Sequence, residues 1–379
     1  MKILIATPIY LPEIGGPATY IKELCARINN KHDITVVAYS DFGVAFPGIK
    51  LVKVTKHAPL LQRLIKYFLS LWKTSKDTEV MYVQNAMAAG LPAALVCVIR
   101  KIPFIVKIVG DEAWERATQH RLTNKNWEEF LEKPEGGLQI KIMMKIQKWV
   151  LGRAKIVTTP SLYMSKEIIK SYGVLPEKIR VNYNAVEETE VSPFKVEPIP
   201  HQIVTTARLI HLKRIDDTIR ALSILKIKYP DTSLVIGGDG PELENLKQLT
   251  HKLNLENDVI FLGKISRAET WQIRKQSSVY VLISTHEGLP ITLLTSLAAK
   301  IPIVATNISG TNEVVYHEKT GLLIGVGDTE ALAKAIERLF EDEKLRNILI
   351  QNGLQLLKEK FSWETHLKIL ENMFMSAIN

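Results

Sequence analysis

Short apolar runs rich in Val and Ile alternate along the whole chain with longer segments whose apolar residues recur at the helical period. Short strands without polar alternation are typical of parallel sheets, because helices cover both faces of such a sheet. The pattern therefore predicts an α/β fold. Strands are expected at residues 2–7, 33–39, 79–84, 103–109, 154–159 and 178–183, and in the second half at 202–207, 232–238, 258–263, 278–284 and 301–306.

A stretch with neither helical nor alternating period separates the two series of strands. Residues 187–201 contain three prolines and several acids, which indicates a linker. A chain of 379 residues is long enough for two domains. We therefore predict one Rossmann-like domain over residues 1–190, a second over 191–360, and a final amphipathic helix over 361–379.

Charge and cysteine content restrict the partners and the compartment. The net charge of +9 suits a phosphorylated substrate, an anionic membrane or nucleic acid. Nucleic acid is the least favoured, because the basic residues are dispersed and no aromatic–basic recognition motif is present. Cys25 and Cys97 lie in apolar runs without metal-ligand spacing, and the first residues make a poor signal peptide, so a reducing, cytoplasmic location is predicted.

Loops that follow strands carry the candidate binding residues, because ligands of open α/β sheets bind beyond the carboxyl ends of the strands. In the first loop, Gly15 and Gly16 precede Pro17, and this start of a helix either binds an anion or is a flexible connection. In a second loop, Arg208 and Lys213 follow the strand at 202–207, where two cations either clamp a diphosphate or face water.

Three glycines follow the strand at 232–238. Gly237, Gly238 and Gly240 do not form the dinucleotide-binding pattern GxGxxG, because Leu243 stands where its last glycine would be. We interpret this segment as a tight turn beside a ligand.

The sequence STHEGLP places a carboxylate, a glycine and a proline at the start of a predicted helix. Main-chain N–H groups between Gly288 and Ile291, at the positive end of the helix dipole, would favour an anion. Glu287 either caps this helix or accepts hydrogen bonds from sugar hydroxyls beside a bound diphosphate.

In this order and spacing the motifs resemble glycosyltransferase family four, whose members are retaining enzymes with the GT-B fold. The resemblance extends from IGGPATYI through TPSLYMSKEI and EKIRVNYNAV to ARLIHLKRIDDTIRA, IGGDGPELENL, VIFLGKIS and STHEGLP. It implies two Rossmann-like domains that face a cleft, with a nucleotide-sugar held mainly by the C-terminal domain and the acceptor by the N-terminal domain. It also implies that the last helix crosses back onto the first domain.

The resemblance implies roles for individual residues. Arg208 and Lys213 would bind the donor diphosphate and stabilise the leaving group without a metal ion or other cofactor, and the chain contains no Asp-x-Asp triplet. Glu287 would hold hydroxyls of the donor sugar. Further donor contacts would come from Gly288, Leu289 and Pro290 at the turn, from Gly16 on the opposite wall, and from Lys264 and Ile265 at the base.

Two positions depart from the family pattern. Thr295 stands eight residues after Glu287, where the family usually has a second Glu that grips the ribose, and a hydroxyl accepts fewer hydrogen bonds than a carboxylate. Gly110 stands where the family commonly has a His, and it is followed by Asp111 and Glu112. We predict that Asp111 is catalytic and orients the sugar or acceptor, with capping of an ordinary helix as the alternative.

Residues 60–73 and 138–155 have apolar positions flanked by basic residues. These helices either cover the N-terminal sheet with their lysines in water, or contact an anionic membrane that carries a lipid-linked acceptor.

The sequence thus predicts a metal-independent glycosyltransferase of hexosyltransferase type, which moves a sugar with retention from a nucleotide-diphosphate donor to a hydroxyl of a polysaccharide or glycolipid precursor. A nucleotide-sugar epimerase of the same fold and a catalytically impaired nucleotide-sugar-binding protein are the alternatives.

Overall fold

The computed structural model describes residues 1–13, 16–187 and 196–379, and the chain divides into two compact units. Unit 1 comprises Met1–Asn182 and Lys368–Asn379, and unit 2 comprises Tyr183–Leu367. The domain boundary predicted between residues 190 and 191 lies outside the described residues. No helix of the described residues is long and apolar enough to cross a membrane.

Unit 1 is built on a parallel sheet of seven strands in the order β3-β2-β1-β4-β5-β6-β7. Every residue of β4, β5 and β6 is buried, which explains why apolar and polar residues do not alternate in these strands. The strands are β1 Lys2–Thr7, β2 Asp33–Tyr39, β3 Ile49–Val54, β4 Val80–Gln84, β5 Phe104–Lys107, β6 Ile156–Thr159 and β7 Ile179–Val181.

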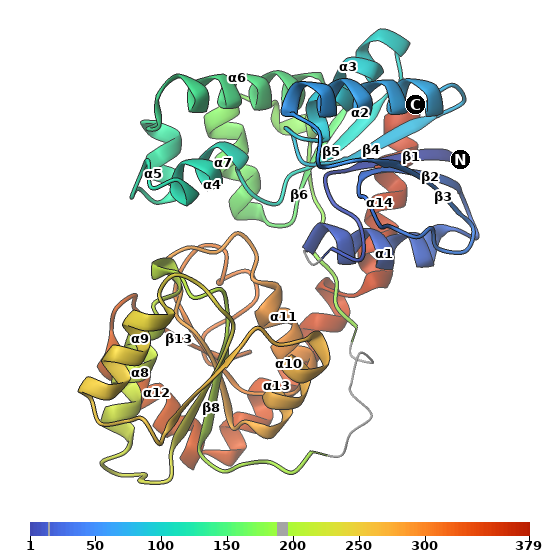
Figure 1. The fold of residues 1–379 in the computed structure, drawn as a ribbon. Helices are drawn as coiled ribbons and strands as arrows, with labels where there is room; N and C mark the ends of the chain where they lie inside the picture. Colours follow the sequence, from blue (N-terminus) through green and yellow to red (C-terminus); the bar gives the residue numbers. More distant parts are fainter. Residues whose placement is uncertain (14–15, 188–195) are drawn as a thin grey trace. The chain divides into compact units, whose positions relative to one another are not determined.

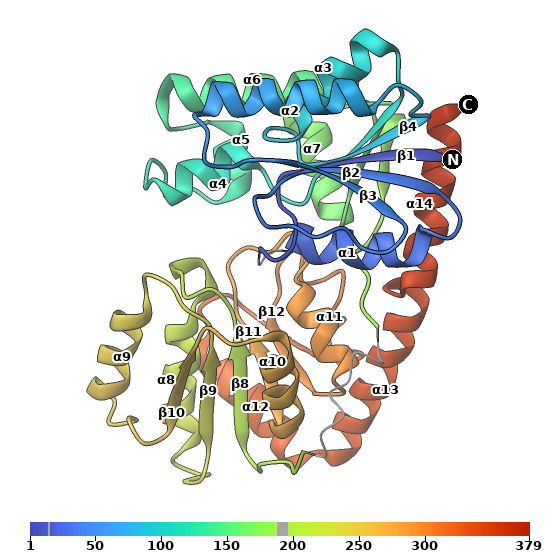
Figure 2. The ribbon, with the colours of Figure 1, turned by 45° about the vertical axis from the view of Figure 1, so that its right-hand side comes forward.

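Helices cover both faces of this sheet. The helices α2, α3 and α6 lie side by side over one face, and α1 and the end of α14 lie over the other (Figure 1 and Figure 2). The helices of the unit are α1 Gly16–Ile28, α2 Leu60–Thr74, α3 Gly90–Arg100, α4 Glu112–Gln119, α5 Trp127–Glu132, α6 Gly137–Arg153, α7 Leu162–Tyr172 and the 3₁₀ turn η1 Pro176–Lys178.

The last helix of the chain, α14 (Trp363–Ile378), begins in unit 2, and its residues from Lys368 onward belong to unit 1. There the ring of Phe374 packs edge-on against Tyr82 with 5.7 Å between ring centroids, and His32 Nε2 lies 2.7 Å from Glu371 Oε1. The end of the chain is therefore part of the unit 1 core.

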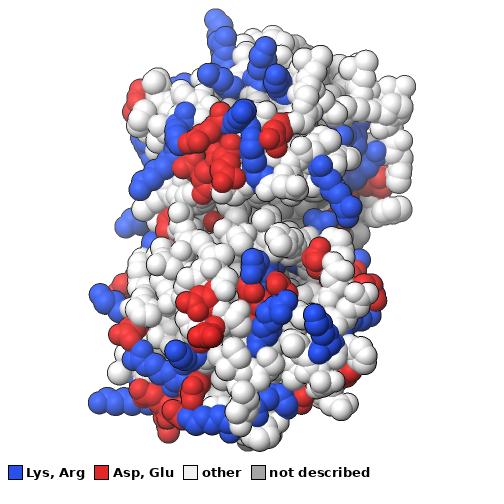
Figure 3. Space-filling view, turned by 90° about the vertical axis from the view of Figure 1, so that its left-hand side faces the viewer, with Lys and Arg blue, Asp and Glu red and all other residues white. Residues whose placement is uncertain are grey.

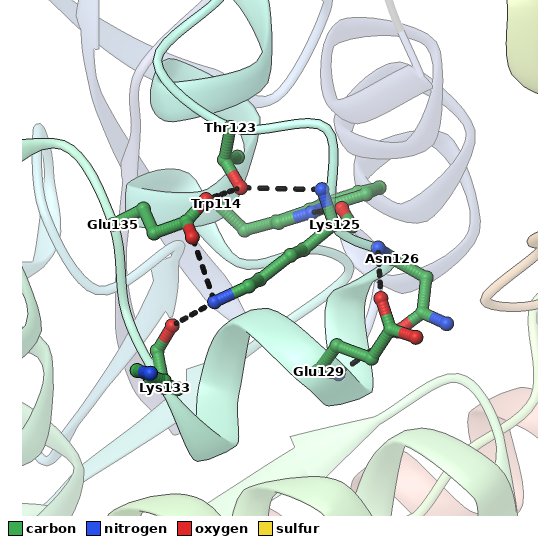
Figure 4. A network of polar contacts seen from close by, with 7 residues as sticks. All are labelled: Trp114, Thr123, Lys125, Asn126, Glu129, Lys133 and Glu135. Carbon is green, nitrogen blue, oxygen red and sulfur yellow. Dashed lines mark hydrogen bonds and ion pairs between the residues drawn. The ribbon is translucent and has the colours of Figure 1, made fainter.

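A polar network centred on Lys125 holds the segment between β5 and α6 (Figure 4). The Nζ atom of Lys125 lies 2.8 Å from Glu135 Oε1 and donates to the main-chain oxygen of Lys133 at 3.0 Å. The indole Nε1 of Trp114 donates to the main-chain oxygen of Lys125 at 3.1 Å. These contacts tie the loops on both sides of α5 to α4, and so fix the helix that starts just after Asp111.

Unit 2 contains a parallel sheet of six strands in the order β10-β9-β8-β11-β12-β13, with an apolar core on each face. Its strands are β8 Gln202–Thr206, β9 Ser233–Gly237, β10 Val259–Gly263, β11 Val279–Leu282, β12 Ile303–Thr306 and β13 Leu322–Ile324. Its helices are η2 His211–Lys213, α8 Ile215–Leu225, α9 Leu243–Lys252, α10 Arg267–Gln276, α11 Ile291–Ala298, α12 Thr329–Glu341 and α13 Glu343–Lys360.

The α/β prediction is confirmed, and each predicted strand is present within a few residues of its expected position. Two strands were not predicted, and both lie at the edge of a sheet. In the edge strand β3 only the first and last residues, Ile49 and Val54, are buried, and β13 has only three residues. Neither has the continuous buried run that marks β4, β5 and β6.

Candidate functional site

The loops that follow β8, β9 and β11 are joined by main-chain hydrogen bonds at the carboxyl ends of the unit 2 strands. The N–H of Thr285 donates to the oxygen of Leu212 at 2.8 Å, which joins the loop after β11 to the loop after β8. The N–H of Leu209 donates to the oxygen of Asp239 at 3.0 Å, which joins the loop after β8 to the loop after β9. The candidate residues on these loops are therefore brought to one place.

Lys213 and Glu287 form an ion pair at this place. Lys213 Nζ donates to Glu287 Oε1 at 2.6 Å, and the two side chains are only 20% and 12% exposed. The hydroxyl of Ser284 donates to the same oxygen at 2.6 Å. Among the described residues Oε2 of Glu287 has no partner, so this oxygen is left to accept hydrogen bonds from a ligand. The sequence analysis gave Lys213 and Glu287 separate roles, whereas in the structure the two side chains contact each other.

The neighbouring cations Arg208 and Arg214 differ in what they contact. Arg208 is exposed, and its guanidinium has no partner among the described residues. Arg214 has a positive φ of 46°, and its Nε and Nη2 donate to the two carboxylate oxygens of Asp217 at 2.9 and 2.8 Å. Arg214 therefore stabilises the start of α8, whereas the guanidinium of Arg208 forms no ion pair with the described residues.

Glycines allow these loops to approach one another. A Cβ atom on Gly238, whose φ is 135°, would lie 1.8 Å from the main-chain oxygen of Ala207, next to Arg208. A Cβ atom on Gly310 would lie 1.9 Å from the main-chain oxygen of Glu287. Gly238 and Gly310 thus allow close packing against the loops that carry Arg208 and Glu287. This close packing explains why glycine is needed in the turn at residues 237–240.

Gly238→Ala is expected to destabilise unit 2 by about 1–3 kcal/mol, because the substitution combines a positive φ with a clash against backbone. Gly310→Ala is expected to displace the Glu287 loop, because its Cβ would clash with the main-chain oxygen of Glu287. Gly325→Ala is the matched control, since its nearest contact would be 3.7 Å away. Chemical unfolding measures the effect, and equal stability of Gly238→Ala and Gly325→Ala would contradict it.

Thr295 in α11 contacts a buried arginine that the sequence analysis missed. Arg274 is 2% exposed; its Nη1 donates to Thr295 Oγ1 at 2.6 Å and its Nη2 to Thr206 Oγ1 at 2.7 Å. The guanidinium also lies over the ring of Tyr280, and burial lowers the pKa of Arg274. No carboxylate pairs with it among the described residues. The sequence did contain a sign that Arg274 is buried. It follows Trp271 by three residues, which places both on one face of α10.

The remaining donor-side candidates lie around the same strand ends. Ile265 follows β10 and packs against Gly237, the last residue of β9. A Cβ atom on Gly237 would lie 2.5 Å from Ile265 Cδ1. Leu289 is buried in the core, and Pro290 is the residue that precedes α11. Gly288 lies half-buried between them and Glu287.

In unit 1, Asp111 is buried and caps α4. Its Oδ1 accepts from the N–H of Trp114 at 2.9 Å and from Gln147 Nε2 at 3.4 Å, and its Oδ2 accepts from the hydroxyl of Tyr172. Capping was the alternative interpretation of this residue. Both of its oxygens are used inside the unit, so a direct catalytic role of Asp111 stays a prediction.

Two acids next to Asp111 were not singled out from the sequence. A Cβ atom on Gly110 would lie 2.0 Å from Glu115 Oε1, so the Glu115 carboxylate occupies the space of a side chain at position 110. Burial raises the pKa of Glu112 to about 7, although the N–H of Met87 donates to its carboxylate at 2.8 Å. Gly16 begins α1, and a Cβ atom there would meet nothing within 4 Å.

Glu112→Gln is expected to raise stability at pH 8 and to lose this advantage as the pH falls. The folded pKa of about 7 lies above the ordinary value of 4.5, so above pH 7 the folded protein carries the full cost of a buried charge. Below pH 4.5 the group is neutral in both states, and the cost vanishes. Urea unfolding at pH 5 and pH 8 measures the difference, with the exposed Glu177→Gln as control. A pH-independent effect would contradict the assignment.

Two family models match adjacent parts of the chain. The model described as Glycosyltransferase Family 4 matches residues 14–190, and the model described as Glycosyl transferases group 1 matches residues 188–356. Neither supports the epimerase alternative.

Individual proteins are similar at low identity. N-acetyl-alpha-D-glucosaminyl L-malate synthase of Bacillus anthracis is 23% identical over 350 residues, which covers 92% of this chain and 84% of that protein. An uncharacterized glycosyltransferase of Methanocaldococcus jannaschii is 25% identical over 235 residues, which covers 59% of this chain and 60% of that protein. The crystal structure of Anabaena HepE in complex with UDP-glucose has a TM-score of 0.77 and 20% identity, over 98% of this chain and 99% of that chain.

Proposed function

The chain belongs to glycosyltransferase family 4 and has the GT-B fold, and on this premise we propose that it transfers a hexose from a uridine diphosphate sugar to a hydroxyl group of an acceptor. Sugar transfer from a nucleotide-sugar follows from the family. The choice of uridine and of a hexose is supported by the UDP-glucose complex of the similar HepE structure. The observation that carries the proposal is the Lys213–Glu287 pair at the carboxyl ends of the unit 2 strands.

In the proposed mechanism the donor diphosphate lies against Arg208, Lys213 and the main-chain N–H groups that precede α11. The bond between the anomeric carbon and the diphosphate oxygen breaks, and the leaving diphosphate gains negative charge. Two cations and the positive end of a helix stabilise that charge because their positions are set before the reaction. No metal ion is required for this role.

Glu287 is proposed to hold the donor sugar. Its Oε1 already accepts from Lys213 and Ser284, and Oε2 remains to accept from a sugar hydroxyl. The carboxylate thus keeps the sugar next to the diphosphate without repelling it, because Lys213 neutralises much of its charge. Thr295 is proposed to contact the ribose, and Ile265 the base.

Unit 1 is proposed to bind the acceptor. Asp111 fixes the start of α4, so it would position the neighbouring Glu112 rather than contact the substrate itself. The acceptor hydroxyl forms the new bond to the anomeric carbon and passes its proton to the leaving diphosphate, which is compatible with retention of configuration. We propose a polysaccharide or glycolipid precursor as acceptor, at the cytoplasmic face of a membrane.

The test is release of nucleoside diphosphate when the purified protein is given UDP-hexoses and a panel of sugar and lipid-linked acceptors, with EDTA present. Transfer with EDTA, and an α-linked product from an α-linked donor by NMR, are the expected results. Glu287→Gln should lose most of the activity, and the exposed Glu330→Gln is the control. Donor binding without transfer to any acceptor would indicate an impaired binding protein, and activity only with added metal would overturn the metal-free mechanism.

A further inference from the structure

The outer face of unit 1 is formed by α2, α3 and α6, and these three helices contain no acidic residue. These helices lie side by side in both views (Figure 1 and Figure 2), and all their residues are described. Figure 3 shows Lys and Arg side chains and no acidic ones along the top of unit 1, the edge on which α6 lies in Figure 1. The exposed basic residues of this α2–α3–α6 face are Lys66, Lys73, Lys141, Lys145, Lys148 and Arg153.

The same face exposes large apolar side chains. On α2 the core-facing residues are Tyr67 and Leu71, whereas Leu61, Ile65 and Leu69 form an outer stripe at intervals of four residues. A helix that only covers a sheet needs one apolar stripe, and α2 has two. The exposed apolar residues of the face are Leu60, Leu61, Ile65, Leu69, Leu95, Val98, Ile99, Leu138 and Ile142, each between 39% and 75% exposed.

Two half-buried tryptophans lie on these helices. Trp72 near the end of α2 lies under the guanidinium of Arg100 at 4.0 Å, and Trp149 of α6 has the guanidinium of Arg153 at 6.0 Å. Indole rings and long basic side chains are the groups that favour the boundary between lipid headgroups and acyl chains.

We propose that the α2–α3–α6 face binds the surface of a bilayer that contains anionic phospholipids, without crossing it. Interspersed positive and apolar groups match a surface whose phosphates lie just above its acyl chains. A second copy of this chain fits less well, because two such faces would bring like charges together. The inference does not depend on the donor site, since binding to lipid can be measured without turnover.

The experiment is flotation of the full chain with phosphatidylcholine vesicles that contain 30% phosphatidylglycerol, compared with vesicles of phosphatidylcholine alone. Binding is expected only to the anionic vesicles, and it should weaken as salt is raised. Lys141→Glu with Lys145→Glu should weaken binding at least tenfold. Lys334→Glu with Lys344→Glu, which makes the same charge change at exposed sites of unit 2, should leave it unchanged.

The apolar contribution is tested separately. Leu61→Ser with Ile65→Ser should weaken binding at all salt concentrations, whereas Ile227→Ser at an 86% exposed site of unit 2 is the control. Absence of binding to anionic vesicles, or equal losses in test and control variants, would overturn the proposal. Concentration-dependent dimerisation that the Leu61→Ser, Ile65→Ser variant abolishes, without lipid binding, would assign the face to a second copy instead. Transfer to a water-soluble acceptor should persist in these variants.

Discussion

Arg208→Ala is expected to lower kcat for sugar transfer by about 100- to 1,000-fold, an effect similar to the loss of one oxyanion-stabilising donor. Arg208 is exposed on the loop after β8, and its guanidinium makes no contact among the described residues. Its removal should therefore leave the fold intact while the charge on the leaving diphosphate loses a fixed partner. The measurement is kcat at saturating donor, together with the melting temperature as a check on folding.

The control for this prediction is Arg220→Ala, because Arg220 is an exposed arginine on α8 of the same unit. This variant should retain full activity. Arg208→Lys keeps the charge but not the planar pair of donors, so its activity should be intermediate. Near-wild-type turnover by a folded Arg208→Ala protein would refute the proposed role in stabilising the leaving group.

Thr295→Glu is expected to have the second largest effect, on both stability and donor affinity. The new carboxylate would lie next to Arg274, a buried cation that now contacts only hydroxyls and a tyrosine ring. An ion pair there should stabilise the protein by about 1–2 kcal/mol, because one of its charges is already buried. The second carboxylate oxygen would accept from a ribose hydroxyl, and nucleoside diphosphate should bind about tenfold more tightly.

Thermal unfolding and calorimetry measure the two effects of Thr295→Glu independently. Thr295→Gln is the matched neutral control, which should reproduce neither gain. In the double variant Arg274→Met, Thr295→Glu the gain in stability should disappear, because the carboxylate then lacks its partner. Unchanged or weaker binding of nucleoside diphosphate would count against the ribose assignment, and an unchanged melting temperature would count against the pairing with Arg274.

The positions of most strands could be predicted because each strand is marked by residues within the strand itself. The fully buried strands β4, β5, β6, β8, β11 and β12 each contain consecutive apolar residues rich in Val and Ile. The edge strands β3 and β13 were not predicted, because β3 interrupts its apolar residues with two lysines and β13 has only three residues. A position at the edge of a sheet did not by itself prevent recognition, since the edge strands β7 and β10 were predicted.

The candidate site was only partly predictable, because its residue types are local but their pairing is not. Arg208, Lys213 and Glu287 were selected from loops that follow strands, and main-chain hydrogen bonds bring these loops together. The partner of Lys213 lies 74 residues away in the sequence, so no spacing rule connects the two. Arg274 was passed over because a charged residue on a helix is expected to face water.

By itself, the amino-acid sequence determined the α/β class, the two-domain organisation of the family and the loops that carry the candidate residues, because periodicity and motifs are properties of neighbouring residues. Only the tertiary structure showed that Lys213 pairs with Glu287 and that Asp111 caps a helix. It also showed that the buried Arg274 contacts Thr295 and has no carboxylate partner among the described residues. These facts depend on which distant side chains share a low-dielectric space, and that space exists only after the sheets and helices have packed.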